Sequence, residues 1–127
     1  MIYLDSSAAV KLVRRELETD ALRARIGANP QPMVSSVLVR TEVSRALIRT
    51  DPSALPNLRM VIATINQVPI TDAVLDAAAA MPEPALRSLD AIHLATAMHL
   101  SPSWFATYDK RLVEAARCRG LRVLSPQ

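Results

Sequence analysis

Five short apolar runs, separated by segments of helix-forming character, constrain the fold of this 127-residue chain more than any other feature. We expect strands at residues 1–4, 32–35, 68–70, 104–107 and 121–124. Helices are expected between them, at residues 8–14, 18–26, 36–50, 58–67, 71–80, 88–100 and 109–119. Short buried strands that alternate with helices predict one α/β domain, residues 1–127, with a parallel sheet covered on both faces.

Several predicted helix ends carry residues that cap or stop a helix. Thr71 is a typical N-terminal cap, and Gly27 and Gly120 each follow a helical segment where a glycine stop is expected. Arg117 and Arg119 precede Gly120, which is the usual order of cation and then glycine at a helix C-terminus.

The composition favours a protein outside the membrane. Half of the residues are hydrophobic but only 3% are aromatic, so the core must consist of Ala, Val, Leu and Ile. No apolar run reaches the ~18 residues of a membrane span, and no signal segment opens the chain. Cys118 is the only cysteine and has no disulfide partner within the chain. We therefore expect a cytoplasmic protein, and its mean hydropathy of +0.17 favours an apolar surface covered by a second copy or another protein.

The charges are unevenly divided between residue types. Fifteen Lys and Arg face twelve Asp and Glu, and only Lys11 and Lys110 are lysines. Arginine is suited to bidentate contacts with phosphate, which favours a nucleic-acid partner. A net charge of +3 is nevertheless common in proteins that bind no nucleic acid.

Four acidic residues lie inside or beside apolar runs, where a carboxylate is costly unless it is compensated: Asp5, Glu42, Asp90 and Asp109. Asp5 and Asp109 follow predicted strands, and parallel sheets place their sites at the carboxyl ends of the strands. Asp90 falls in the first turn of its helix, and Glu42 lies mid-helix beside an apolar row. The four side chains are therefore predicted to converge and to share a cation.

Each acid also has a separate structural explanation. Asp5 and Asp109 are possible helix N-caps, and Asp90 is a possible partner of a helix dipole. Glu42 has Arg45 and Arg49 at helical spacing and could form an ion pair with either. We prefer the shared site because the separate explanations do not account for the common placement.

The sequences around these acids carry a family resemblance. The motifs are Tyr-Leu-Asp-Ser-Ser-Ala at residues 3–8, Thr-Glu-Val at 41–43, Leu-Asp-Ala-Ile-His-Leu-Ala at 89–95 and Phe-Ala-Thr-Tyr-Asp at 105–109. In this order and spacing they resemble the four acidic motifs of PIN-domain ribonucleases, and more narrowly VapC-type toxins of toxin–antitoxin pairs. The resemblance spans the chain and implies an α/β/α sandwich with a short parallel central sheet.

It also implies a metal-dependent endoribonuclease. Oxygen ligands without His or Cys select hard cations, so Mg²⁺ or Mn²⁺ is the expected cofactor. By resemblance Asp5 and Asp90 are direct ligands, and Glu42 and Asp109 complete the catalytic site directly or through water. We expect His93, three residues after Asp90, to be a packed structural histidine rather than a general base.

Four further residues are candidates for contacts with substrate. Ser6 and Thr107 are hydroxyl neighbours of the acids that could hold a ligand water or a phosphate oxygen. Lys11 and Arg14 follow the Asp5 strand and are candidates for binding RNA phosphates, although a solvated helix face is the preferred explanation for them.

The implied partners are an RNA substrate, a VapB-like antitoxin and a second copy of the chain in a homodimer. A catalytically silent PIN-fold module that binds RNA or protein is the alternative function. A phosphoacceptor of the receiver type also uses an acidic pocket with Mg²⁺. That fold requires paired acids after its first strand, where this chain has a single Asp5 followed by Ser6.

Overall fold

The computed structural model describes all residues, 1–127. Its elements, in chain order, are β1 (Ile2–Leu4), α1 (Ser6–Val13), α2 (Thr19–Ala28), β2 (Met33–Ser36), α3 (Leu38–Thr50), a 3₁₀ turn η1 (Pro52–Ala54), α4 (Leu55–Ile62), β3 (Ile65–Val68), α5 (Asp72–Ala79), α6 (Ser88–Leu100), β4 (Trp104–Ala106), α7 (Lys110–Cys118) and β5 (Val123–Leu124). This alternation is the predicted α/β arrangement.

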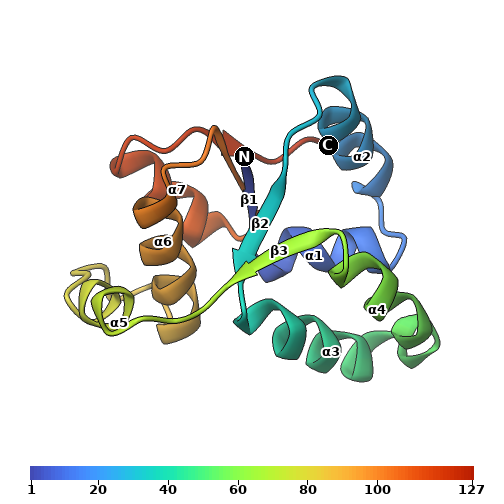
Figure 1. Ribbon diagram of the computed structural model, residues 1–127, viewed down its shortest axis with the longest axis horizontal. Coiled ribbons are helices and arrows are strands. Elements are labelled where there is room, and N and C mark those ends of the chain that lie inside the picture. Colours follow the sequence, from blue (N-terminus) through green and yellow to red (C-terminus); the bar gives the residue numbers. More distant parts are fainter.

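All five strands are parallel and lie in the order β3-β2-β1-β4-β5. The first strand of the chain is therefore the central one, and β4 joins it with Tyr3 opposite Phe105. Figure 1 shows α1, α3 and α4 on one side of the sheet and α5, α6 and α7 on the other. The expectation of an α/β/α sandwich is confirmed. Because the strands are parallel, their carboxyl ends share one edge.

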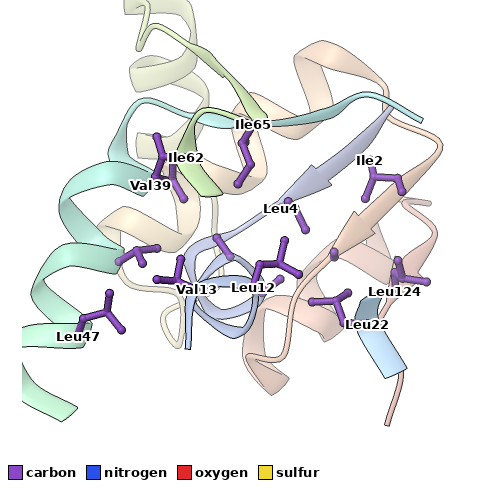
Figure 2. Packing of buried hydrophobic residues seen from close by; sticks show 14 of the residues in the cluster. Ile2, Leu4, Leu12, Val13, Leu22, Val39, Leu47, Ile62, Ile65 and Leu124 are labelled. Carbon is purple, nitrogen blue, oxygen red and sulfur yellow. The ribbon is translucent and has the colours of Figure 1, made fainter. Parts of the chain in front are cut away.

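The alternation of side chains along β1 divides the core into two layers. Ile2 and Leu4 pack against apolar residues of α1 and α3, in the cluster drawn in Figure 2. Tyr3 points the other way and packs with Phe105 and with Leu94 of α6. Apart from Tyr3 and Phe105, the buried apolar side chains are almost all aliphatic, as the composition requires.

Several predicted boundaries were wrong. The helix placed at 58–67 ends at Ile62, and the third strand is Ile65–Val68 rather than 68–70. Gly27 does not stop α2, which continues to Ala28. Thr71 caps α5 through its side chain, as expected. None of the helices has the length and apolar character needed to span a lipid bilayer.

Candidate active site

Two of the four acids begin helices directly after neighbouring strands. Asp5 follows β1 and caps α1, accepting the N–H of Ala8 at 2.9 Å. Asp109 follows β4 and caps α7, accepting the N–H groups of Arg111 and Leu112. Both residues are N-caps, and the pairing of β1 with β4 places the two caps at the same edge of the sheet. The cap and the shared site are therefore compatible explanations.

Asp5 is fully enclosed by hydrogen-bond donors and is only 3% exposed. Its Oδ1 accepts from Ser7 Oγ at 2.7 Å as well as from Ala8, and its Oδ2 accepts from Thr107 Oγ1 at 2.6 Å. Burial raises the pKa of this carboxyl, against the opposing effect of these bonds. A carboxylate has about four acceptor positions, so one position on Oδ2 is left for a further ligand.

Asp90 lies in the first turn of α6 and is half-buried. Its Oδ2 accepts the N–H of Arg87 at 3.3 Å, which ties the carboxylate to the residue before the helix. Burial raises the pKa of Asp90, and the negative charges of Asp109 and Glu42 raise it further. Asp90 is thus close enough to both Asp109 and Glu42 to be repelled by their charges.

Glu42 ends a chain of hydrogen bonds that starts in the sheet. Ser36 N–H donates to the hydroxyl of Tyr3, and that hydroxyl lies 2.7 Å from Nδ1 of His93. Burial raises the pKa of Tyr3, so its hydroxyl keeps its hydrogen. Nε2 of His93 lies 2.5 Å from Glu42 Oε1, so the imidazole bridges the tyrosine hydroxyl and the carboxylate.

The pairing of Glu42 with Arg45 or Arg49, which helical spacing allowed, does not form. Ser6 Oγ donates to Glu42 Oε2 at 3.3 Å, so His93 and Ser6 are the partners of this carboxylate. His93 is 1% exposed and bonded at both ring nitrogens, which confirms the expectation of a packed histidine.

A pocket of about 550 Å³ opens beside Glu42 and Asp90. It lies between α1, α3 and the start of α6. Its lining is mostly polar: Ser6, Ser7, Val10, Thr41, Glu42, Arg45, Ala46, Arg49, Arg87, Ser88, Leu89 and Asp90. Two acids, Glu42 and Asp90, and three arginines, Arg45, Arg49 and Arg87, give the pocket charges of both signs. A second, smaller cavity of about 330 Å³ lies beside α2 and α4, away from the acids, and its lining is more apolar than that of the first pocket.

Comparison with known proteins identifies the family. The PIN domain family model matches residues 2–117, a range that contains all four acids. Ribonuclease VapC35 of Mycobacterium tuberculosis is 44% identical over 131 residues, covering 99% of this chain and 97% of the relative. Ribonuclease VapC46 of the same species is 45% identical, covering 98% and 97%. The chain belongs to the PIN-domain family, in its VapC ribonuclease group.

The fold of this VapC chain is also that of solved structures. A toxin–antitoxin complex from Klebsiella pneumoniae has a chain that superposes with a TM-score of 0.77, covering 100% of this chain and 98% of that one. The two sequences are only 20% identical there, so the likeness concerns the fold alone.

The structure separates the predicted contact residues of the VapC chain into two groups. Ser6 lines the pocket and contacts Glu42, as a site residue should. Thr107 is fully buried and donates its one hydrogen to Asp5 while accepting the N–H of Asp109 at 3.1 Å. It therefore holds two acids in place, and the prediction that it contacts water or phosphate is not supported.

Lys11 and Arg14 do not line the pocket. The ammonium of Lys11 binds Glu16 at 2.6 Å and Glu18 at 2.9 Å, and it lies over the ring of Tyr108. Burial lowers the pKa of Lys11, but these two carboxylates outweigh it and raise the pKa. Arg14 lies within 4 Å of Glu16 and Asp51. Both cations are thus paired within the protein, which does not support their predicted contacts with RNA.

Sequence reasoning missed several residues of this VapC site. Ser7 donates to Asp5 and accepts the N–H of Tyr108 at 2.9 Å, yet only its neighbour Ser6 was a candidate. The repeated serine after Asp5 was the available signal, since a helix turns successive side chains in different directions. Nothing in the sequence indicated the pairing of Tyr3 with His93, which lies 90 residues away.

The ligand atoms that the acids of the VapC site offer are carboxylate oxygens, which suit a hard cation. No Lys or Arg forms an ion pair with Asp5, Glu42 or Asp90, so the buried and mutually repelling charges have no strong counter-charge. No three His, Cys, Asp or Glu side chains are close enough to enclose one metal ion. Mg²⁺ is commonly held by one or two carboxylates and several waters, so it does not need three protein ligands. The free acceptor position on Asp5 could supply one such ligand.

Proposed function

We propose that this VapC chain is a Mg²⁺- or Mn²⁺-dependent endoribonuclease that hydrolyses RNA phosphodiester bonds. The observation that carries the proposal is the group of carboxylates at the carboxyl edge of the sheet. Within this group, Asp5, Glu42 and Asp90 form no ion pair with any Lys or Arg. Such a group is costly to fold and has a clear use only when a cation binds there.

In this proposal Asp5 and Asp90 hold the ion directly, and Glu42 and Asp109 complete the site directly or through water. When bound, the ion supplies a water nucleophile at neutral pH and offsets negative charge on the phosphodiester. The protein supplies the positioning: Thr107 and Ser7 fix both oxygens of Asp5, and His93 and Ser6 fix those of Glu42. Fixed carboxylates lower the cost of reorganisation when substrate arrives.

The activity is tested by incubating total cellular RNA with the chain and mapping the cut ends by sequencing. The wild type is compared with Asp90→Asn, each in Mg²⁺, in Mn²⁺ and with chelator. Asp76→Asn is the matched control, because it makes the same charge change on the exposed surface of α5. Discrete cuts that require metal and Asp90, but not Asp76, are expected.

A folded wild type that makes no cuts, free of any antitoxin, would support the alternative of a catalytically silent PIN-fold module that binds RNA or protein. Normal cutting by Asp90→Asn would show that the proposed site is wrong.

We further propose a VapB-like antitoxin as partner and a homodimer as the working form, both in the cytoplasm. The relatives are VapC ribonucleases, and a chain of a toxin–antitoxin complex shares the fold. Large apolar side chains are partly exposed on several helices, among them Ile48, Leu75, Leu89 and Met98. Such residues suit a covered face. Light scattering of the purified chain, alone and with a VapB-like antitoxin, measures both assemblies.

A further inference from the structure

Three arginines that line the pocket beside the acids have no protein partner for their charge. Arg45 and Arg49 come from α3, and Arg87 immediately precedes α6. None of the three forms an ion pair or a side-chain hydrogen bond with the protein. The structure pairs Arg14, Arg15, Arg111 and Arg119 with carboxylates, whereas Arg40, Arg59 and Arg117 also lack a partner but do not line the pocket.

The two arginines of α3 are unpaired although an acid is within helical reach. Glu42 precedes Arg45 by three residues and Arg49 by seven, on the same side of the helix. His93 and Ser6 occupy the two oxygens of Glu42 instead. The guanidinium groups are therefore left available to a ligand in the pocket.

The two arginines of α3 extend the pocket away from the acids. A helix rises 1.5 Å per residue, so Arg45 and Arg49 lie about 4.5 Å and about 10.5 Å beyond Glu42 along the axis of α3. With one phosphate at the acids, the next few phosphates of the strand extend along the row of arginines.

Arg87 approaches the pocket from another element and is tied to the acids. Its backbone N–H donates to Asp90, so the position of its main chain is fixed relative to that carboxylate. Cations on both α3 and the start of α6 thus border the same pocket as Glu42 and Asp90.

We propose that Arg45, Arg49 and Arg87 form a subsite that binds the phosphates of the RNA strand adjoining the scissile bond. This inference rests on the proposed ribonuclease function and assigns the part of the site that holds the substrate. An RNA strand suits a pocket that carries both acids and arginines. Its reacting phosphate meets the metal-binding acids, and its neighbouring phosphates meet guanidinium groups.

The test measures how RNA binding depends on salt. Fluorescence anisotropy of a labelled oligouridylate is recorded over a range of salt concentrations with the Asp90→Asn chain, which leaves the probe intact, in the presence of Mg²⁺. Arg45→Gln, Arg49→Gln and Arg87→Gln are each added to that background. Each loss of one phosphate contact is expected to reduce the slope of log K against log salt by about 0.7.

The matched control is Arg40→Gln, which removes the same charge from an exposed position of the same helix that does not line the pocket. It is expected to leave the slope unchanged. Arginine-to-lysine changes at the three positions are expected to restore most of the slope, since the charge is kept. In the otherwise wild-type enzyme, the glutamine variants are expected to raise KM for RNA cleavage while kcat changes little.

Slopes for the three glutamine variants equal to that of Arg40→Gln would overturn the subsite. Loss of antitoxin binding with unchanged RNA slopes would overturn it as well and assign the arginines to the protein partner. Either result leaves metal-dependent cleavage by the wild type intact. Absence of cleavage by the wild type, in contrast, refutes the function on which the subsite rests.

Discussion

At the scale of single residues, the site contains carboxylates whose burial is costly to the fold. Asp5 is buried with three donors around it, and Asp90 is half-buried beside two other acids. The donors lower the cost of burial but supply no positive charge. Stability is therefore given up at the positions where a ligand must bind.

This cost predicts that Asp90→Asn stabilises the metal-free protein. The folded-state pKa of Asp90 is raised, so its ionised form costs stability at neutral pH, and this cost disappears as the pH falls through that pKa. In chelator at neutral pH the variant is expected to unfold at a higher temperature than the wild type. The gain should shrink as the pH approaches 4, and thermal unfolding followed by circular dichroism across that pH range measures it. An equal or lower melting temperature for Asp90→Asn at neutral pH would contradict the prediction.

The link between His93 and Glu42 gives a second prediction at this scale. A glutamine at position 93 can place an N–H donor near the position of Nε2, whereas an asparagine reaches only the position of Nδ1. His93→Gln is expected to retain most cleavage, and His93→Asn to lose about 10- to 100-fold, the usual cost of removing a group that orients a metal ligand. Cleavage rates are compared after both variants are shown to be folded. Equal losses in the two would argue against an orienting bond to Glu42.

At the scale of elements, the two glycines have opposite roles. Gly27 lies inside α2 with no atom near the position of a Cβ, while Gly120 ends the α7 segment with φ of 78°. Gly27→Ala is expected to stabilise the fold by roughly 0.5–1 kcal/mol, and Gly120→Ala to destabilise it by about 1–2 kcal/mol. Urea unfolding of the two variants measures both effects, and the same sign in both would show that backbone conformation does not decide them.

Elements whose apolar pattern was complete could be predicted from sequence, and those that depended on a partner could not. The bounds of α6 match the prediction at both ends, because Ser88 and the following apolar residues indicate a start. The third strand was displaced because Asn66 and Gln67 interrupt its apolar pattern. β3 is an edge strand with β2 as its only neighbour, so polar side chains are tolerated there.

The same division holds for the candidate site. Asp5 and Asp109 were placed at one edge by backbone topology alone, since parallel strands end on the same side. The partners of Glu42 could not be foreseen. The choice between Arg45 and His93 depends on the direction in which a side chain leaves α3 and on packing against a helix 51 residues away.

At the scale of the whole molecule, the concentration of unpaired acids at one edge predicts stabilisation by metal. An ion that binds only the folded state adds about 2.7 kcal/mol at 100 times its Kd. Mg²⁺ is expected to raise the melting temperature of the wild type and of Asp76→Asn, and to raise that of Asp90→Asn much less. Calorimetry across a Mg²⁺ titration provides the measurement, and an equal rise in all three would place the ion elsewhere.

The central position of β1 has a consequence for how the chain is made. The strand synthesised first must wait for β4, and Asp5 must wait for Thr107, a partner 102 residues later. Any product that stops before residue 104 therefore lacks both the neighbour of its central strand and the hydroxyl that fixes its first acid. We therefore expect unfinished chains to be inert, and the proposed capacity to cut RNA to arise only with the last fifth of translation.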